Sequence, residues 1–138
     1  MKYWSIAFVM FAACILTSCN KESNRWDGDW NAMIWQAEKG KTAVDGIFEV
    51  SSEGGEMDFV CANYSFPWIE YAHFGDIYYY PNREGNEYRT VSVDWFSAEI
   101  NGNKLKVSFE PNNTAKERPI SLTVTAGDIF YTFKFKQL

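Results

Sequence analysis

The alternation that decides the fold lies in residues 104–137, which read KLKVSFEPNNTAKERPISLTVTAGDIFYTFKFKQ. Apolar and polar residues alternate there in three runs, at 104–110, 120–126 and 129–136. Successive side chains of a β-strand point to opposite faces, so each run predicts a strand with one buried face. Gly127 and Asp128 separate the last two runs, and this pair is typical of a two-residue hairpin turn.

The rest of the chain predicts further short strands. They lie at 30–37 with Met33, Trp35 and Ala37 on one face, at 47–50, at 56–62 with Met57, Phe59 and Cys61 inward, at 66–71, at 77–80 and at 89–95. Pro67 cannot donate to a strand ladder, which predicts an edge position for 66–71. No stretch shows helical periodicity over ten residues. Seven to nine short strands in about 110 residues predict an all-β protein, a β-sandwich.

The first 18 residues have a different pattern. Lys2 precedes an apolar run at 6–16, which is shorter than the about 20 residues of a transmembrane helix and fits a signal peptide. Residues 16–19, Leu-Thr-Ser-Cys, resemble the bacterial lipobox. That resemblance implies that Cys19 is diacylated and begins the mature chain. The alternative is an ordinary secretory signal that ends near Ser18.

We therefore expect a lipoprotein signal peptide at 1–18, a flexible tether at 19–28 and one sandwich domain at 29–138. The protein is expected to be an outer-membrane lipoprotein on the periplasmic or cell-surface face, held to the membrane through the lipid on Cys19. Removal of Lys2 with the signal changes the net charge from −5 to −6, which argues against nucleic acid as a partner.

Enzymatic chemistry finds little support in the sequence. His73 is the only histidine, and no Gly-x-Ser-x-Gly or glycine-rich phosphate loop is present. Cys14 leaves with the signal and Cys19 carries lipid, so Cys61 is left without a disulfide partner. Residues 27–38 have part of the spacing of a calcium loop, but Ala32 stands where that loop needs glycine. We expect no enzyme, no cofactor and no metal site.

Aromatic residues between 68 and 82 are the candidates for ligand binding. Rings stack on the apolar face of a pyranose while carboxylates and amides bond its hydroxyls. The candidate carbohydrate-binding residues are Trp68, Tyr71, His73, Asp76, Tyr78, Tyr79, Tyr80 and Asn82. A strand at 77–80 must divide its tyrosines between two faces, so at least one ring points outward. Against this interpretation, Trp68 and Trp95 occupy positions where such a fold fills its core.

From residue 49 onward the chain resembles the BACON domain, a module of secreted and lipid-anchored Bacteroidetes proteins. The residues that carry the resemblance are Gly54-Gly55, Asn63, Trp68-Ile69, Asp94-Trp95-Phe96, Pro111-Asn112, Arg118, the strand at 120–125 and Gln137. Segment 72–88 is longer and more aromatic than the family pattern. The resemblance implies an immunoglobulin-like β-sandwich and a carbohydrate-binding role, although many members act as spacers.

These observations favour a non-enzymatic, lipid-anchored protein of the cell envelope with a carbohydrate-binding sandwich. The alternative is a structural or protein-interaction subunit of an envelope complex with no glycan affinity. Asn112 and Arg118 are better explained as structural residues, since asparagine holds loop turns and arginine can bridge loop carbonyls.

Overall fold

The computed structural model describes residues 30–83, 85 and 87–138. The predicted signal peptide, the whole predicted tether and the lipidation site Cys19 lie outside these residues, as does Asp27 of the rejected calcium loop. Within the described part of the chain, no helix has the length and apolar character needed to cross a membrane.

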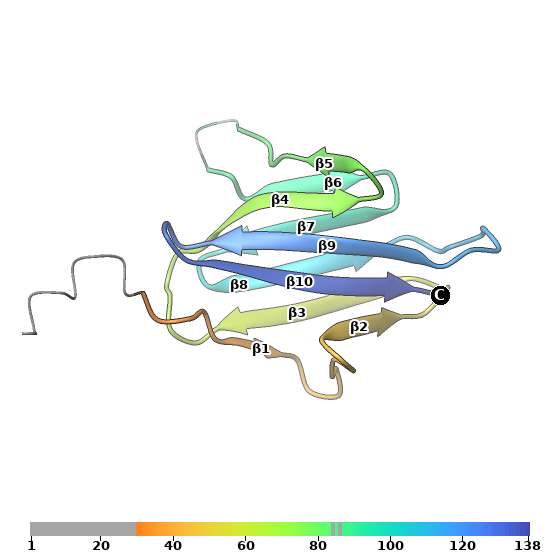
Figure 1. Ribbon diagram of the computed structural model, residues 1–138, viewed down its shortest axis with the longest axis horizontal. Coiled ribbons are helices and arrows are strands. Elements are labelled where there is room, and N and C mark those ends of the chain that lie inside the picture. Colours follow the sequence, from red (N-terminus) through yellow and green to blue (C-terminus); the bar gives the residue numbers. More distant parts are fainter. Residues whose placement is uncertain (1–29, 84, 86) are drawn as a thin grey trace, which may run out of the picture.

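In the described part of the chain, ten strands, more than the seven to nine predicted, form two five-stranded sheets that pack face to face (Figure 1). The first sheet has the order β1-β3-β8-β7-β6 and the second β2-β10-β9-β4-β5. The strands are β1 (Trp35–Ala37), β2 (Ile47–Val50), β3 (Gly55–Cys61), β4 (Trp68–Phe74), β5 (Ile77–Tyr79), β6 (Thr90–Val93), β7 (Phe96–Asn101), β8 (Lys104–Phe109), β9 (Arg118–Thr125) and β10 (Phe130–Gln137). The predicted all-β sandwich is confirmed, and the order matches the A-B-E-D and G-F-C strands of immunoglobulin-like sandwiches.

The opening stretch forms the strands β8, β9 and β10, with β9 and β10 paired as an antiparallel hairpin. Their connection spans 126–129, and Gly127 takes a φ of +118° at its tip. Leu122 and Val124 are fully buried as predicted, but the outward-facing Thr123 and Thr125 are also buried. The prediction of one buried face is therefore wrong for β9, because this strand lies inside the sheet between β10 and β4.

Two other local predictions are also wrong. β4 is not an edge strand, because it pairs with both β9 and β5. Pro67 precedes the first residue of β4, so its missing N–H interrupts no ladder bond. The strand predicted at 89–95 ends at Val93, and Asp94 and Trp95 form the turn into β7. Strand β7 itself was not identified from the sequence.

The core between the sheets is rich in aromatic rings. Phe59 and Phe133 lie 4.7 Å apart between ring centroids, and Phe109 and Phe135 lie 5.4 Å apart. The inward parity of Met57, Phe59 and Cys61 on β3 is confirmed. Paired rings from facing sheets add about 0.5–1.5 kcal/mol each beyond the area they bury. Cys61 lies in this core as a free thiol.

A hydrogen-bonded cluster closes one end of the sandwich. The Arg118 guanidinium donates to the Gln137 Oε1 atom at 2.7 Å and to the carbonyls of Glu110 and Pro111 at 3.3 Å. It also lies 4.3 Å from the centroid of the Trp95 ring, and burial lowers the pKa of Arg118 from its ordinary value. The same cluster contains Asn112, whose amide donates to the Lys116 and Leu138 carbonyls. Both Arg118 and Asn112 thus have the structural contacts expected of them.

Candidate functional site

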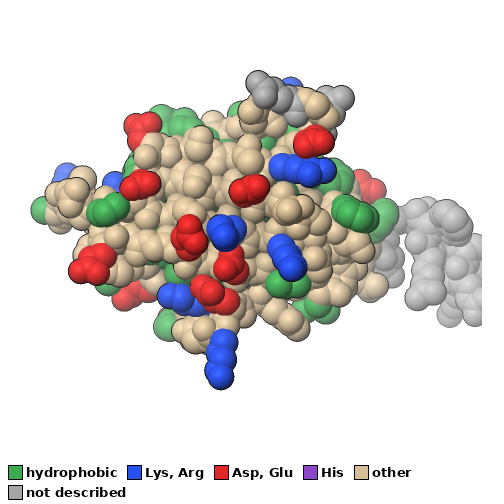
Figure 2. Space-filling view, turned by 180° about the vertical axis from the view of Figure 1, so that it is seen from behind, with side chains coloured by type: hydrophobic (Ala, Val, Ile, Leu, Met, Phe, Trp, Pro, Cys, Tyr) green, Lys and Arg blue, Asp and Glu red, His purple; other side chains and the backbone are tan. Residues whose placement is uncertain are grey.

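The outer faces of the two sheets differ in chemistry. The face of the β1-β3-β8-β7-β6 sheet carries interspersed charges, which Figure 2 shows as acidic and basic side chains spread over the back of the sandwich. One cross-strand pair there joins Lys106 to Glu56 at 4.0 Å between exposed groups. Ion pairs of this kind contribute little to stability. This face therefore resembles an ordinary solvated surface.

The outer face of the other sheet is ordered in rows across the strands. One row runs from Tyr78 to His73, Ser121, Lys134 and Ile47, as the strand registers show. The next row places Tyr71 beside Thr123 and Thr132, whose hydroxyl oxygens lie 2.9 Å apart. Aromatic rings thus occupy the β4–β5 side of this face, hydroxyl groups its middle and lysines its β10 side.

Four of the predicted site residues form an aromatic cluster on this face: Tyr71, His73, Tyr78 and Tyr80. The His73 and Tyr78 rings are stacked with centroids 4.3 Å apart. The Tyr71 ring lies 5.1 Å from that of Tyr78 and 6.5 Å from that of Tyr80, edge to face in both cases. Because the Tyr71 ring stands at a steep angle to both Tyr78 and Tyr80, the four rings do not form one flat platform.

A pocket of about 370 Å³ adjoins the aromatic cluster at Tyr80. We call it the Trp68–Tyr80 pocket, and its lining residues are Trp68, Ile69, Glu70, Tyr80, Pro81, Arg83 and Tyr88. The β4–β9 register shifts between Ile69 and Tyr71, which makes Glu70 the extra residue of a β-bulge. Bulges re-aim side chains and are common beside functional sites. The bulge therefore brings a carboxylate to a pocket lined by rings.

Tyr88 has an unusual backbone in this pocket. Its φ is +45°, a conformation that is rare for a bulky residue. The Tyr88 carbonyl accepts a hydrogen bond from the Ile69 N–H at 3.0 Å, and the Arg83 guanidinium carbon lies 5.9 Å from the Tyr88 ring centroid. A residue held in this region costs on the order of 1–3 kcal/mol, and such residues gather at binding sites.

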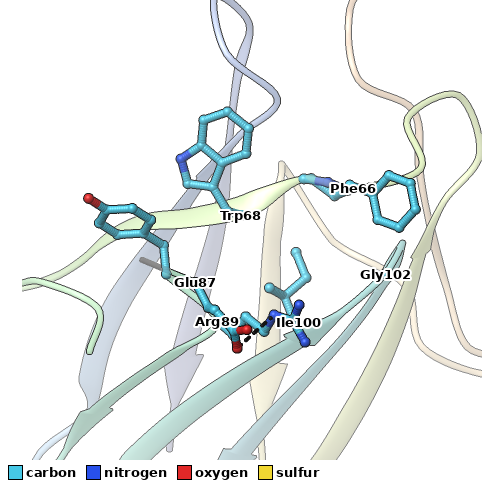
Figure 3. A pocket seen from close by; sticks show the side chains of 8 residues that line it. Phe66, Trp68, Glu87, Arg89, Ile100 and Gly102 are labelled. Atoms are coloured by element: carbon cyan, nitrogen blue, oxygen red, sulfur yellow. Dashed lines mark ion pairs between the residues drawn. The ribbon is translucent and has the colours of Figure 1, made fainter. Parts of the chain in front are cut away.

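A second pocket, of about 380 Å³, shares Trp68 and Tyr88 with the first. Figure 3 shows Phe66 and Trp68 on one side of it and Ile100 and Arg89 on the other. Arg89 pairs with Glu87 at 3.4 Å, the contact drawn as dashed lines. The two pockets are therefore neighbours along a single aromatic wall.

The structure brings five of the eight predicted residues together and separates the rest. Trp68, Tyr71, His73, Tyr78 and Tyr80 share the face or pocket described above. Tyr79 points the other way and packs against the core. Asp76 lies in the exposed turn between β4 and β5. Asn82 donates its backbone N–H to the Thr90 carbonyl and lines a different pocket, with Thr90 and Ser92.

The core position considered for Trp68 is wrong. Trp68 pairs with Thr125 on the outward side of β4 and is half-buried, whereas its neighbour Ile69 is fully buried. Trp95 is half-buried and does pack against the core. The sequence did not indicate Glu70, Arg83 or Tyr88 as site residues, because neither a bulge nor a loop folded back over a strand leaves a periodic signal.

A metal site needs several acidic, histidine or cysteine side chains close together. Within the residues that the structure describes, no three His, Cys, Asp or Glu side chains lie close enough to hold a metal ion. The arrangement of rings with one carboxylate and one guanidinium suits recognition of a polar ligand that has apolar faces.

Comparison with known proteins gives a structural relative and no family. No protein-family model matches the chain, and no curated protein matches it. A protein from Bacteroides thetaiotaomicron, whose structure was determined by NMR, has a similar structure with a TM-score of 0.66. The two chains are 29% identical, and the similarity covers 78% of this chain and 87% of the other.

Proposed function

We propose that this protein is a non-enzymatic, lipid-anchored protein of the cell envelope that binds a carbohydrate in the Trp68–Tyr80 pocket. One observation carries the proposal: the rings of Trp68, Tyr80 and Tyr88 surround a space of about 370 Å³ together with Glu70 and Arg83. Rings offer a surface for the apolar face of a pyranose, and the two charged groups bond its hydroxyls. Specific ligand sites commonly combine apolar walls with a few polar groups in this way.

The lipid anchor rests on the lipobox resemblance at residues 16–19. Diacylation of Cys19 supplies two acyl chains, and two chains are enough for stable attachment where one is marginal. The resemblance to the BACON domain supports an outer-membrane lipoprotein of the Bacteroidetes type, and the similar solved structure is of a protein from a Bacteroides species. The same resemblance supports carbohydrate as the ligand class.

A second candidate function is a protein-interaction subunit with no glycan affinity. The exposed aromatic cluster favours it, since Tyr78 and Tyr80 are 50% and 62% exposed on the outer surface. Aromatic side chains are enriched where proteins meet. A partner protein would cover the aromatic cluster itself, whereas a sugar would enter the pocket beside it.

The test is binding of the unlipidated mature protein, residues 20–138, to an array of host and dietary glycans. We expect binding that falls at least tenfold in Tyr80→Ala and in Glu70→Gln, equivalent to about 1.4 kcal/mol. Tyr131→Ala is the matched control, because Tyr131 is an accessible tyrosine on β10 outside the pocket. Absence of binding across the array, or binding that neither pocket variant weakens, would overturn the proposal in favour of the interaction subunit.

A further inference from the structure

The two ends of the sandwich differ sharply in charge. We call the end at which the chain enters the tether end; Figure 1 shows it at the left, where residue 30 and several strand connections meet. It is formed by residues 30–34, 62–67, 102–103 and 126–129, among which Asp128 is the only charged residue. The β5–β6 connection lies at the margin of this end, and its sequence contains two bases and two acids: Arg83, Glu84, Glu87 and Arg89.

The opposite end is acidic. Its connections span 51–54, 75–76, 94–95 and 110–117. They carry Glu53, Asp76, Asp94, Glu110 and Glu117, against Lys116 and the neighbouring Arg118 at the start of β9. The two ends therefore differ in net charge: the charges at and beside the tether end nearly cancel, whereas acidic residues outnumber basic ones at the opposite end.

Large apolar side chains are exposed at the tether end. The exposed fraction is 48% for Trp30, 55% for Ile34, 81% for Phe66 and 56% for Phe130. Hydrogen bonds hold the segments together, since the Ala62 N–H donates to the Ile34 carbonyl at 2.8 Å. All four side chains belong to segments that meet at this end, and exposed apolar groups at one end of a domain favour a contact surface there.

The length of the preceding chain limits what that surface can meet. Ten residues, 20–29, separate Cys19 from Trp30. A fully extended chain spans at most 3.3–3.6 Å per residue, so the domain begins within about 40 Å of the lipidated cysteine. Because the chain enters at the tether end, this end is the one held nearest to the anchored lipid.

We propose that the tether end docks on the surface of the phospholipid bilayer, an inference that rests on the proposed lipid anchor at Cys19. Trp30, Phe66 and Phe130 lie in the interfacial layer, where aromatic rings are favoured. Few charged groups lose water on contact, and the acidic end faces away from the membrane. The anchor confines the domain, so a weak contact is sufficient for docking.

The test uses the lipidated mature protein in phospholipid vesicles, with one environment-sensitive fluorophore on an introduced cysteine. Cys61→Ala removes the buried thiol. Ser65→Cys places the label on the tether end, and Ser52→Cys places a matched label on the acidic end; both serines are exposed. We expect emission at position 65 to rise about twofold on reconstitution and to be quenched by brominated acyl chains, while position 52 responds to neither.

A double variant, Phe66→Ser with Phe130→Ser, tests the apolar contact directly. Both side chains are exposed, so the fold is expected to survive, and its melting temperature checks this. The response at position 65 should then disappear. The docking proposal would be overturned by equal responses at positions 65 and 52, or by no response at either position. It would also be overturned by a response at position 65 that rises with the density of protein in the vesicle and is unaffected by brominated lipid. That third result would indicate contact between two copies of the protein.

The same experiment separates this proposal from the proposed function. If mass spectrometry finds no diacyl group on the mature protein, the anchor is wrong and the docking falls with it. If the lipid is present and position 65 stays silent, only the docking is wrong. Glycan binding is measured separately, on variants of Tyr80 and Glu70 that leave Phe66 and Phe130 intact.

Discussion

Substitution of Gly54 by alanine should destabilise the protein far more than the same substitution at Gly40. The two glycines have nearly equal φ angles, +85° and +88°. An alanine at either position meets the cost of a left-handed backbone, about 1–2 kcal/mol. A Cβ on Gly40 has no atom within 4 Å, whereas a Cβ on Gly54 would collide with the carbonyl oxygen of Phe109.

The collision at Gly54 cannot be relieved cheaply. Phe109 pairs with Gly55 in the β3–β8 ladder, and its ring packs 5.2 Å from Phe96 and 5.4 Å from Phe135. Moving the Phe109 carbonyl therefore moves a core ring, and overpacking of this kind costs about 1–3 kcal/mol. We expect a loss of about 2–5 kcal/mol in Gly54→Ala and about 1–2 kcal/mol in Gly40→Ala.

Urea unfolding of residues 20–138, followed by tryptophan fluorescence, measures both free energies. Linear extrapolation with equal slopes would show that only native stability has changed. Gly40→Ala serves as the matched control, because it carries the backbone cost without the steric one. A Gly54→Ala variant whose loss agrees with that of Gly40→Ala within about 0.5 kcal/mol would refute the reasoning.

Two further substitutions test local contacts. The Asn63 side chain accepts a hydrogen bond from the Ile34 N–H at 2.9 Å and donates one to the Ala32 carbonyl at 2.7 Å. Asn63→Ala should therefore lower the free energy of unfolding by about 1–2 kcal/mol and speed amide hydrogen exchange in β1. Unchanged exchange in β1 would contradict this role. A lysine at position 118 cannot reproduce the hydrogen bonds of the guanidinium to Gln137 and two carbonyls. Arg118→Lys should therefore lower the free energy of unfolding in urea by about 2 kcal/mol. A variant as stable as the wild type would show that the guanidinium geometry is dispensable.

Most strands followed from local periodicity. The inward set on β3 and the hairpin of β9 and β10 were predicted correctly, because a strand with one wet face alternates visibly. Strand β7 was missed because the apolar–polar alternation of β6 continues through Asp94 and Trp95, which form the turn between β6 and β7. The position of β4 was missed because Pro67 marks an edge only if it lies within the ladder, and it lies just outside.

Trp68 and Tyr80 of the candidate pocket were predicted from the sequence, whereas Tyr88 and the polar residues Glu70 and Arg83 were missed. Period-2 spacing places Tyr78 and Tyr80 on one face and Tyr79 on the other, but it does not say which face meets water. That depends on the pairing of β5 with β4, which sets Tyr78 beside His73. Glu70 and Arg83 entered the pocket through a bulge and a folded-back loop, and neither is a periodic feature.

The sequence by itself determined the all-β class, the parity of most strands and several of the rings that lie on one outer face of the sandwich. These follow from side-chain alternation, which is a local property of the chain. Only the tertiary structure decided that Trp68, Tyr80 and Tyr88 enclose one pocket and that the uncharged connections gather at one end. Residues far apart in the chain meet there because two sheets bury a common core, and the packing of that core selects which strand ends become neighbours.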